Sequence, residues 1–285
     1  MLTCSHRTCP NTQSDLSIRL RGMRGYFLDD AWYCSEDCLE SALKREIERK
    51  MAGLLGGSAN LLQRPLLGLI LLESALISRE QLQEALNYQQ KEKSTRLGQL
   101  LQRLGFVQEK DITAALARQS GFPRMSLERM VANEAILRMI PPRIARLARV
   151  FPVEYNPELN RLSVVMASPD RSVIQTLGKM LRLDIFPYIG DETLLEEVID
   201  QYYQKESDEG NVEEASFAIS DGIASITSEI VRRATMLNSK NLWVERYGDH
   251  LWVRMAVETE AYNLFIRVLP GDKSSTLSDT PLRGR

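Results

Sequence analysis

Residues 66–89 read LLGLILLESALISREQLQEALNYQ, and residues 96–119 repeat the same pattern 30 positions later as RLGQLLQRLGFVQEKDITAALARQ. Apolar residues recur at helical spacing in each copy, so each copy predicts two short helices, the second starting at Ser78 or Gln108. Neither copy can bury its apolar face alone. We therefore expect the copies to pack together as a helical tandem-repeat subdomain over residues 64–120. The identical positions include Leu67/Leu97, Gly68/Gly98, Leu71/Leu101, Ala85/Ala115, Leu86/Leu116 and Gln89/Gln119.

The second copy carries the more informative set of residues: Arg96-Leu97-Gly98, Leu101, Gly105, Phe106-Val107, Ile112, Leu116 and Gln119. This set resembles the MshEN-type domain, which stands at the N-terminus of the ATPases of type II secretion (the general secretion pathway protein E N-terminal region) and type IV pilus assembly. In that family two tandem motifs bind the second messenger cyclic di-GMP. The resemblance implies that Arg and Gln recognise guanines and phosphates, that Gly admits the ligand to the backbone, and that Leu residues form an apolar bed.

Carried over residue by residue, the resemblance implies a cyclic di-GMP site formed by both copies. The second copy matches the motif well, whereas the first has Leu66 in place of Arg and Ala75 in place of the second Gly. Arg64 lies two positions before Leu66, which is out of register. Two interpretations therefore stay open, a retained ligand site and a purely structural helical pair. The candidate ligand residues are Arg96, Leu97, Gly98, Leu101, Gly105, Gln119, Leu67, Gly68 and Gln89.

Residues 121–205 continue the resemblance as an α/β sandwich subdomain. The alternation in residues 161–166 predicts a strand, and Ser168-Pro169-Asp170 starts a helix that runs to Leu181. Residues 184–189 predict another strand, after which Asp191 is expected to cap a final helix. The segment contains no nucleophile beside a histidine and no cluster of metal ligands, so we interpret it as a packing and docking module.

All four cysteines, Cys4, Cys9, Cys34 and Cys38, lie in the first 38 residues. Two close pairs separated by 24 residues are typical of two knuckles that share one tetrahedral zinc. Ser35 is expected to cap a helix that carries Cys38 on its first turn. The ending Tyr33-Cys34-Ser35-x-x-Cys38 resembles treble-clef-like zinc knuckles. We therefore expect structural zinc on these four residues in a domain over residues 1–50. His6 in place of Cys4 or Cys9, and four reduced thiols without metal, remain alternatives.

The C-terminal part predicts a third α/β segment. Residues 206–218 are interpreted as an acidic linker, residues 219–270 as a small degenerate pre-motor domain, and residues 271–285 as a disordered tail. The pre-motor domain is expected to hold an amphipathic helix, a hairpin over residues 241–257 and a further strand. It resembles the segment before the nucleotide-binding core of secretion ATPases, although Asn241 and Trp243 replace that family's Asp and His. The fold class is thus α+β multidomain.

The composition argues against nucleic acid and membranes as partners. The 285 residues hold 36 Lys and Arg against 38 Asp and Glu, a net charge of −2, so no basic field predicts nucleic acid or anionic membrane as a partner. Residues 65–77, the most apolar stretch, are shorter than the ~20 residues of a membrane span. The first residues lack the apolar segment of a signal peptide. We expect a cytoplasmic protein.

The sequence favours a regulator over an enzyme. A phosphate loop with the spacing Gly-x4-Gly-Lys-Ser/Thr does not occur, and Gly271-Asp272-Lys273-Ser274 lacks the first Gly. His6 and His250 are the only histidines. The leading hypothesis is a non-enzymatic regulatory or adaptor protein, with a secretion or pilus ATPase or its inner-membrane platform protein as partner. A structural scaffold that has lost nucleotide binding is the alternative, and an enzyme is the third class.

Overall fold

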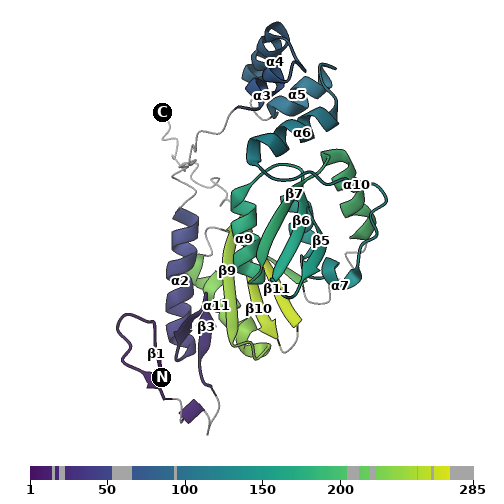
Figure 1. The fold of residues 1–285 in the computed structure, drawn as a ribbon. Coiled ribbons are helices and arrows are strands. Elements are labelled where there is room, and N and C mark those ends of the chain that lie inside the picture. The colour runs from purple at the N-terminus through teal and green to yellow at the C-terminus, as the bar shows by residue number, and fades with distance from the viewer. Residues whose placement is uncertain are drawn as a thin grey trace, which may run out of the picture. The chain divides into compact units, whose positions relative to one another are not determined.

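The computed structural model describes residues 1–14, 17–18, 23–52, 66–92, 95–203, 212–218, 222–248, 250–257 and 260–269 (Figure 1). The chain divides into two compact units, each built from helices and sheets, so the α+β class is confirmed. Unit 1 joins Met1–Gly57 to Asn211–Arg285, and unit 2 is Ser58–Gly210. No helix among the described residues is long and apolar enough to cross a membrane.

The repeat in unit 2 forms two helices in each copy, as the periodicity predicts. The helices are α3 (Leu67–Glu73), α4 (Arg79–Lys91), α5 (Leu97–Arg103) and α6 (Glu109–Ser120). Ser78 begins α4 with a capping box, in which its Oγ accepts from the Gln81 N–H at 3.2 Å and Gln81 Oε1 accepts from the Ser78 N–H at 2.8 Å. The four helices bury one apolar core that contains Ile70, Leu71, Ile77, Ala85, Leu101, Val107 and Ala115.

Two glycines set how closely the two helices of each copy pack, and both glycines lie beside the other copy. A Cβ on Gly68 would lie 2.7 Å from Leu82 Cδ1 and 3.5 Å from Leu97 Cδ2. At the matching position, a Cβ on Gly98 would lie 3.1 Å from Ile112 Cγ2 and 3.5 Å from Leu67 Cδ2. Each glycine therefore meets a side chain of its own copy and the leading leucine of the other copy. The two copies interlock with approximate two-fold symmetry.

The rest of unit 2 is a three-stranded sheet in the order β5-β6-β7, with helices packed against it (Figure 1). Strands β5 and β6 are antiparallel, and β6 and β7 are parallel with α9 as their crossover. Asp170 caps α9 as expected, because its Oδ1 accepts from the Ser172 N–H at 2.8 Å. The elements are α7 (Glu134–Leu137), α8 (Pro142–Ala148), β5 (Val150–Asn156), β6 (Arg161–Met166), α9 (Arg171–Leu181), β7 (Asp184–Ile189) and α10 (Glu192–Tyr202).

The N-terminus of α10 differs from the expectation. Asp191 stands at the cap position, but its carboxylate accepts from the Thr113 hydroxyl of α6 and makes no capping hydrogen bond. Glu109 of α6 acts instead, because its Oε1 accepts from the Thr193 N–H at 2.7 Å. The reason is the packing of the two helices. α6 lies so close to α10 that the Asp191 carboxylate reaches Thr113 of α6, while the Glu109 carboxylate of α6 reaches the first turn of α10. These two hydrogen bonds attach the second copy of the repeat to the α/β layer.

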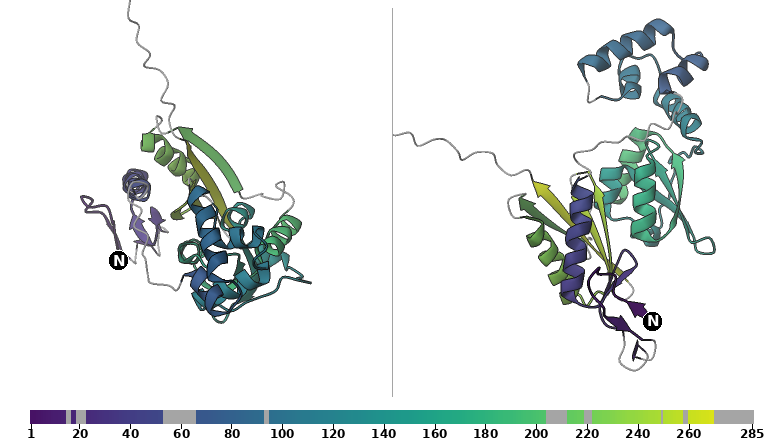
Figure 2. Two further views of the ribbon diagram at one scale, coloured as in Figure 1. Left: turned by 90° about the horizontal axis from the view of Figure 1, so that it is seen from above. Right: turned by 90° about the vertical axis from the view of Figure 1, so that its left-hand side faces the viewer.

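Unit 1 is a six-stranded sheet in the order β4-β3-β9-β10-β11-β8. Helices α2 (Glu36–Ala52) and α11 (Gly222–Met236) cover one of its faces (Figure 2). The strands are β3 (Tyr26–Leu28), β4 (Ala31–Tyr33), β8 (Val212–Ala218), β9 (Asn241–Tyr247), β10 (His250–Val257) and β11 (Glu260–Leu269), and a separate two-stranded ribbon joins β1 (Leu2–Thr3) to β2 (Thr12–Gln13). The hairpin predicted over residues 241–257 is confirmed.

This sheet joins segments that the sequence analysis separated. Residues 1–50 and 219–270 were expected as separate domains, but β3 pairs in parallel with β9 through Phe27↔Asn241 and Leu28↔Leu242. The pairing satisfies backbone groups of two edge segments that could not form a wide sheet separately. Strands β3 and β4 and helix α2 thus belong to the same core as the C-terminal segment.

The acidic linker predicted over residues 206–218 is wrong in its second half. Residues 212–218 form β8, which pairs in parallel with β11. Its charge is tolerated because Glu213 forms an ion pair with the nearly buried Arg233 of α11, while Ala215 and Phe217 pack on the core. Residues 204–211 and the predicted tail over residues 271–285 lie outside the described residues.

A left-handed turn supplies a stability test. Gly105 has φ +74° with no atom within 4 Å of a Cβ position, and Ala75 has φ +54° at the matching position of the first copy. A side chain in this region costs ~1–2 kcal/mol, partly offset by the greater unfolded-state freedom of glycine. We expect Ala75→Gly to raise the free energy of unfolding by ~0.5 kcal/mol and Gly105→Ala to lower it by ~0.5–1 kcal/mol. Urea denaturation measures both, and changes of the same sign would contradict the assignment.

Candidate metal centre and ligand surface

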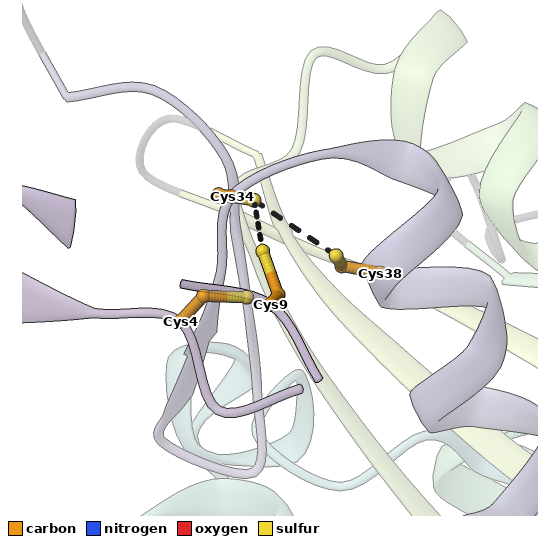
Figure 3. A group of neighbouring side chains, drawn as sticks. All are labelled: Cys4, Cys9, Cys34 and Cys38. Carbon is orange, nitrogen blue, oxygen red and sulfur yellow. Dashed lines mark hydrogen bonds between the residues drawn. The ribbon is translucent and has the colours of Figure 1, made fainter. Parts of the chain in front are cut away.

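The four cysteines come together from three parts of unit 1. Cys4 follows β1, Cys9 lies in the loop before β2, Cys34 follows β4, and Cys38 lies in the first turn of α2. Their sulfur atoms point toward one another (Figure 3). Ser35 fixes the last of them, since its Oγ accepts from the Cys38 N–H at 3.3 Å. The expected cap at Ser35 is therefore confirmed.

The spacing of the sulfurs fits zinc. All four lie within 4.8 Å of one another, with Cys9 Sγ 3.5 Å and Cys38 Sγ 3.9 Å from Cys34 Sγ. A tetrahedral site with Zn–S bonds of ~2.3 Å needs sulfurs ~3.8 Å apart. Zinc would be held by four thiolates, as in structural sites that leave no open coordination position. The residues present fit a structural metal.

The pKa of the Cys34 thiol is lowered, whereas the pKa values of Cys9 and Cys38 are raised. Burial opposes the ionisation of Cys34, but a hydrogen bond from Asn11 Nδ2 at 3.3 Å and bonds from the neighbouring thiols lower the pKa of Cys34 to about 7. Burial raises the pKa of Cys38 to about 12, against the effect of its hydrogen bond with Ser35. Sequence reasoning missed Asn11. Its place two residues after a knuckle cysteine, where a side-chain amide can reach the second pair, was the available signal.

His6 does not join this group. Among the described residues, the ligand atoms brought within 4.8 Å of one another at this site are the four sulfurs alone. His6 Nδ1 lies 3.3 Å from Thr8 Oγ1 in the same loop. The geometry favours the all-cysteine set over the alternative with His6.

In unit 2 some of the candidate ligand residues lie at the surface, and the others lie in the helical core. Arg96 is exposed at the position before α5, and its Nη1 lies 3.4 Å from Ser168 Oγ. Gln89 is partly buried, and its Nε2 donates to the Thr95 carbonyl at 3.2 Å. Leu67, Leu97 and Gln119 are also partly buried. These side chains are the part of the predicted set that a ligand could touch.

The remaining members of the set have packing roles. Leu101 is fully buried in the helical core, so it cannot form the surface of a ligand site in this structure. Gly68 and Gly98 are buried against Leu82 and Ile112, which explains the requirement for glycine without a ligand. Gly105 is exposed and serves the left-handed turn.

The first copy keeps the backbone of the motif and lacks its charge. Leu66 has φ −65° and ψ 139°, close to the φ −73° and ψ 144° of Arg96. Leu66 is 69% exposed, so a longer side chain meets no obstacle from burial at this position. Leucine in place of arginine at position 66 therefore removes one guanidinium and leaves the backbone conformation unchanged. Arg64 lies outside the described residues.

Comparison with known proteins places the α/β layer in a family. Residues 120–209 match the model of the MshEN domain family. This region is a MshEN domain. The match begins where α6 ends, so the tandem repeat predicted over residues 64–120 lies before the matched range.

Relatives extend the similarity beyond the MshEN domain. The type IV pilus assembly ATPase PilB of Myxococcus xanthus (strain DK1622) is 26% identical over 220 residues, which cover 70% of this chain and 38% of PilB. The chain thus spans less than half of that relative's length. The structure of MshE with cdg (cyclic di-GMP) shares 30% identity over 49% of this chain and all of that chain, with a TM-score of 0.44. The N-terminal domain of XpsE shares 22% identity over 47% of this chain and 92% of that chain, with a TM-score of 0.40.

The cysteine cluster predicts one zinc ion per chain. We expect native mass spectrometry of the protein to show one zinc, and Cys34→Ser or Cys38→Ser to lose it, because each removes a thiolate from a site without spare ligands. His6→Ala is the matched control and is expected to keep the metal.

Metal removal is expected to destabilise unit 1 selectively. The cluster fixes β4 to the start of α2, so chelation should expose the amides of β3 and α2 to hydrogen exchange and leave α9 of unit 2 protected. Zinc-supplemented protein with four freely reactive thiols and no metal would instead identify a plain thiol cluster.

Proposed function

We propose that this chain is a non-enzymatic regulatory or adaptor protein whose tandem repeat binds cyclic di-GMP. The observation that carries the proposal is the interlock of the two copies, in which Leu67 and Leu97 each contact the glycine of the other copy. Cyclic di-GMP is itself two-fold symmetric, with two guanines and two phosphates. An approximately two-fold pair of motifs is the surface that can offer one half-site to each half of such a ligand.

The chemistry of the exposed residues supports this ligand. The guanidinium of Arg96 suits both the Hoogsteen edge of guanine and a phosphate oxygen. Its hydrogen bond to Ser168 is long and made at the surface, so little is lost when a ligand replaces it. The amide of Gln89 lies at the end of the first copy, and Leu67 and Leu97 supply apolar contact. MshE, whose structure was solved with cyclic di-GMP, shares 30% identity with about half of this chain.

The attachment of the repeat to the MshEN domain supports a regulatory role. Thr113 and Glu109 of α6 hold the first turn of α10 in the MshEN domain through Asp191 and Thr193. A ligand on the second copy would therefore favour one position of the helices α5 and α6, and α6 contacts the MshEN domain. We propose that this preference is transmitted to a secretion or pilus ATPase, or to its inner-membrane platform protein, in the cytoplasm.

A structural scaffold is the second candidate, and a specific observation favours it. Leu66 stands where the motif has Arg, and the core glycines and Leu101 are explained by packing alone. In this alternative the modules act only through protein contacts. Nucleotide binding separates the two candidates.

Calorimetric titration of cyclic di-GMP into the full chain tests the proposal. We expect Arg96→Ala to weaken binding by a factor of ~10 or more, the value of a charged hydrogen bond of ~1.5–3 kcal/mol. Arg103→Ala is the matched control, because Arg103 lies on the same helix and pairs with Glu92 at 2.9 Å. It should bind like the unmodified chain.

Restoring the first motif should strengthen the site. Leu66→Arg adds the missing guanidinium on a backbone that already has the required conformation, so we expect binding to tighten ~10-fold. No heat with folded, zinc-loaded protein would establish the scaffold. An equal loss in Arg96→Ala and Arg103→Ala would point to general charge attraction instead of a site.

A further inference from the structure

The two copies of the repeat present different outer faces. Along α5 the second copy exposes Arg96, Gln99 and Arg103, and at the matching positions the first copy exposes Leu66, Leu69 and Glu73. Leu76 after α3 is also exposed, whereas its counterpart Phe106 is partly buried against the helical core. Leu66, Leu69 and Leu76 are 69%, 55% and 40% exposed. The first copy thus carries an apolar stripe where the second is mostly polar.

The second copy uses its outer face within the chain. Gln99 Nε2 lies 3.4 Å from a Glu192 carboxylate oxygen, and Glu109 Oε1 accepts from the Thr193 N–H. The matching residues of the first copy are Leu69 and Arg79, and both are exposed. The matching α5–α6 face of the second copy contacts α10. By approximate symmetry, the α3–α4 face of the first copy is therefore a candidate docking face.

This face is hollowed. An open groove of about 700 Å³ runs between the end of α3 and the start of α4, and Leu69, Leu72 and Leu76 form its apolar wall. Glu73 and Arg79 also line it. The groove therefore presents an apolar surface together with one acid and one base.

Those two charges interact with their own chain only at exposed positions. Arg79 occupies the first position of α4, where the helix dipole disfavours a cation, and the second copy has Glu109 there. Glu73 pairs with Arg118 at 2.9 Å, but both side chains are more than half exposed, and such pairs contribute little. An external acid near Arg79 and an external base near Glu73 would each be favourable.

We propose that a second copy of this chain occupies the groove, in a two-fold dimer formed by the α3–α4 faces. A two-fold axis sets identical apolar stripes against each other and brings Arg79 of each copy to Glu73 of the other. The surface is small beside the ~800 Å² that each partner buries in a stable interface, so the association is weak and depends on concentration. The groove lining includes Leu69 and Leu76 but not Leu66, so this dimer does not depend on the position that Leu66→Arg changes in the proposed cyclic di-GMP site.

Sedimentation velocity of the full chain, from roughly 1 μM to 1 mM, measures the association. We expect a reversible monomer–dimer equilibrium, weakened at least tenfold by Leu69→Asp. Leu159→Asp is the matched control: Leu159 is 57% exposed against 55% for Leu69, but it lies in the turn between β5 and β6. A monomer at every concentration, or a dimer unchanged by Leu69→Asp, overturns the proposal.

Charge reversal tests the geometry of the pair. Glu73→Arg and Arg79→Glu should each weaken self-association, because each places like charges together. An equimolar mixture of the two variants should associate again, since all facing charges are then opposite. A mixture as weak as the separate variants overturns the two-fold arrangement. Leu69→Asp should leave the affinity for cyclic di-GMP unchanged, so the dimer and the ligand site can fail separately.

Discussion

The close packing at two glycines determines how the helices of the repeat lie against one another. Because Gly68 and Gly98 lack a Cβ, Leu82 and Ile112 can pack closely on the first helix of their own copy. Each glycine also lies beside the leading leucine of the other copy, so the starts of α3 and α5 are neighbours. The proposed ligand surface and the attachment to the MshEN domain both involve the second copy, through Arg96 before α5 and through Thr113 and Glu109 of α6.

Unit 1 depends on a different long-range contact. The short strand β3 pairs with β9, and α2 packs beside α11 on the same face of the sheet. The cysteine cluster lies where β4 leads into α2, so it holds together the N-terminal elements that extend the C-terminal sheet. A metal there would stabilise more than a local knuckle. It would fix the elements that extend the sheet beyond β9.

The two copies of the repeat show how a duplication can divide its roles. The second copy keeps the full motif and uses its outer face to hold α10. The first copy keeps the same backbone, with Ala75 in the left-handed conformation of Gly105, but has lost Arg at Leu66 and gained exposed leucines. One copy carries the residues of the motif, and the other exposes Leu66, Leu69 and Leu76.

Local features were determined by the sequence alone. Helical periodicity predicted α3 to α6, the caps at Ser78 and Asp170 were readable from residue type, and the spacing of the cysteines predicted the cluster. Only the tertiary structure decided that residues 1–52 complete the C-terminal sheet and that Glu109 exchanges roles with Asp191. The physical reason is the separation along the chain of the residues that determine each feature. Periodicity and capping depend on neighbours within a few residues, whereas strand pairing and shared caps depend on partners that the chain brings together from far apart.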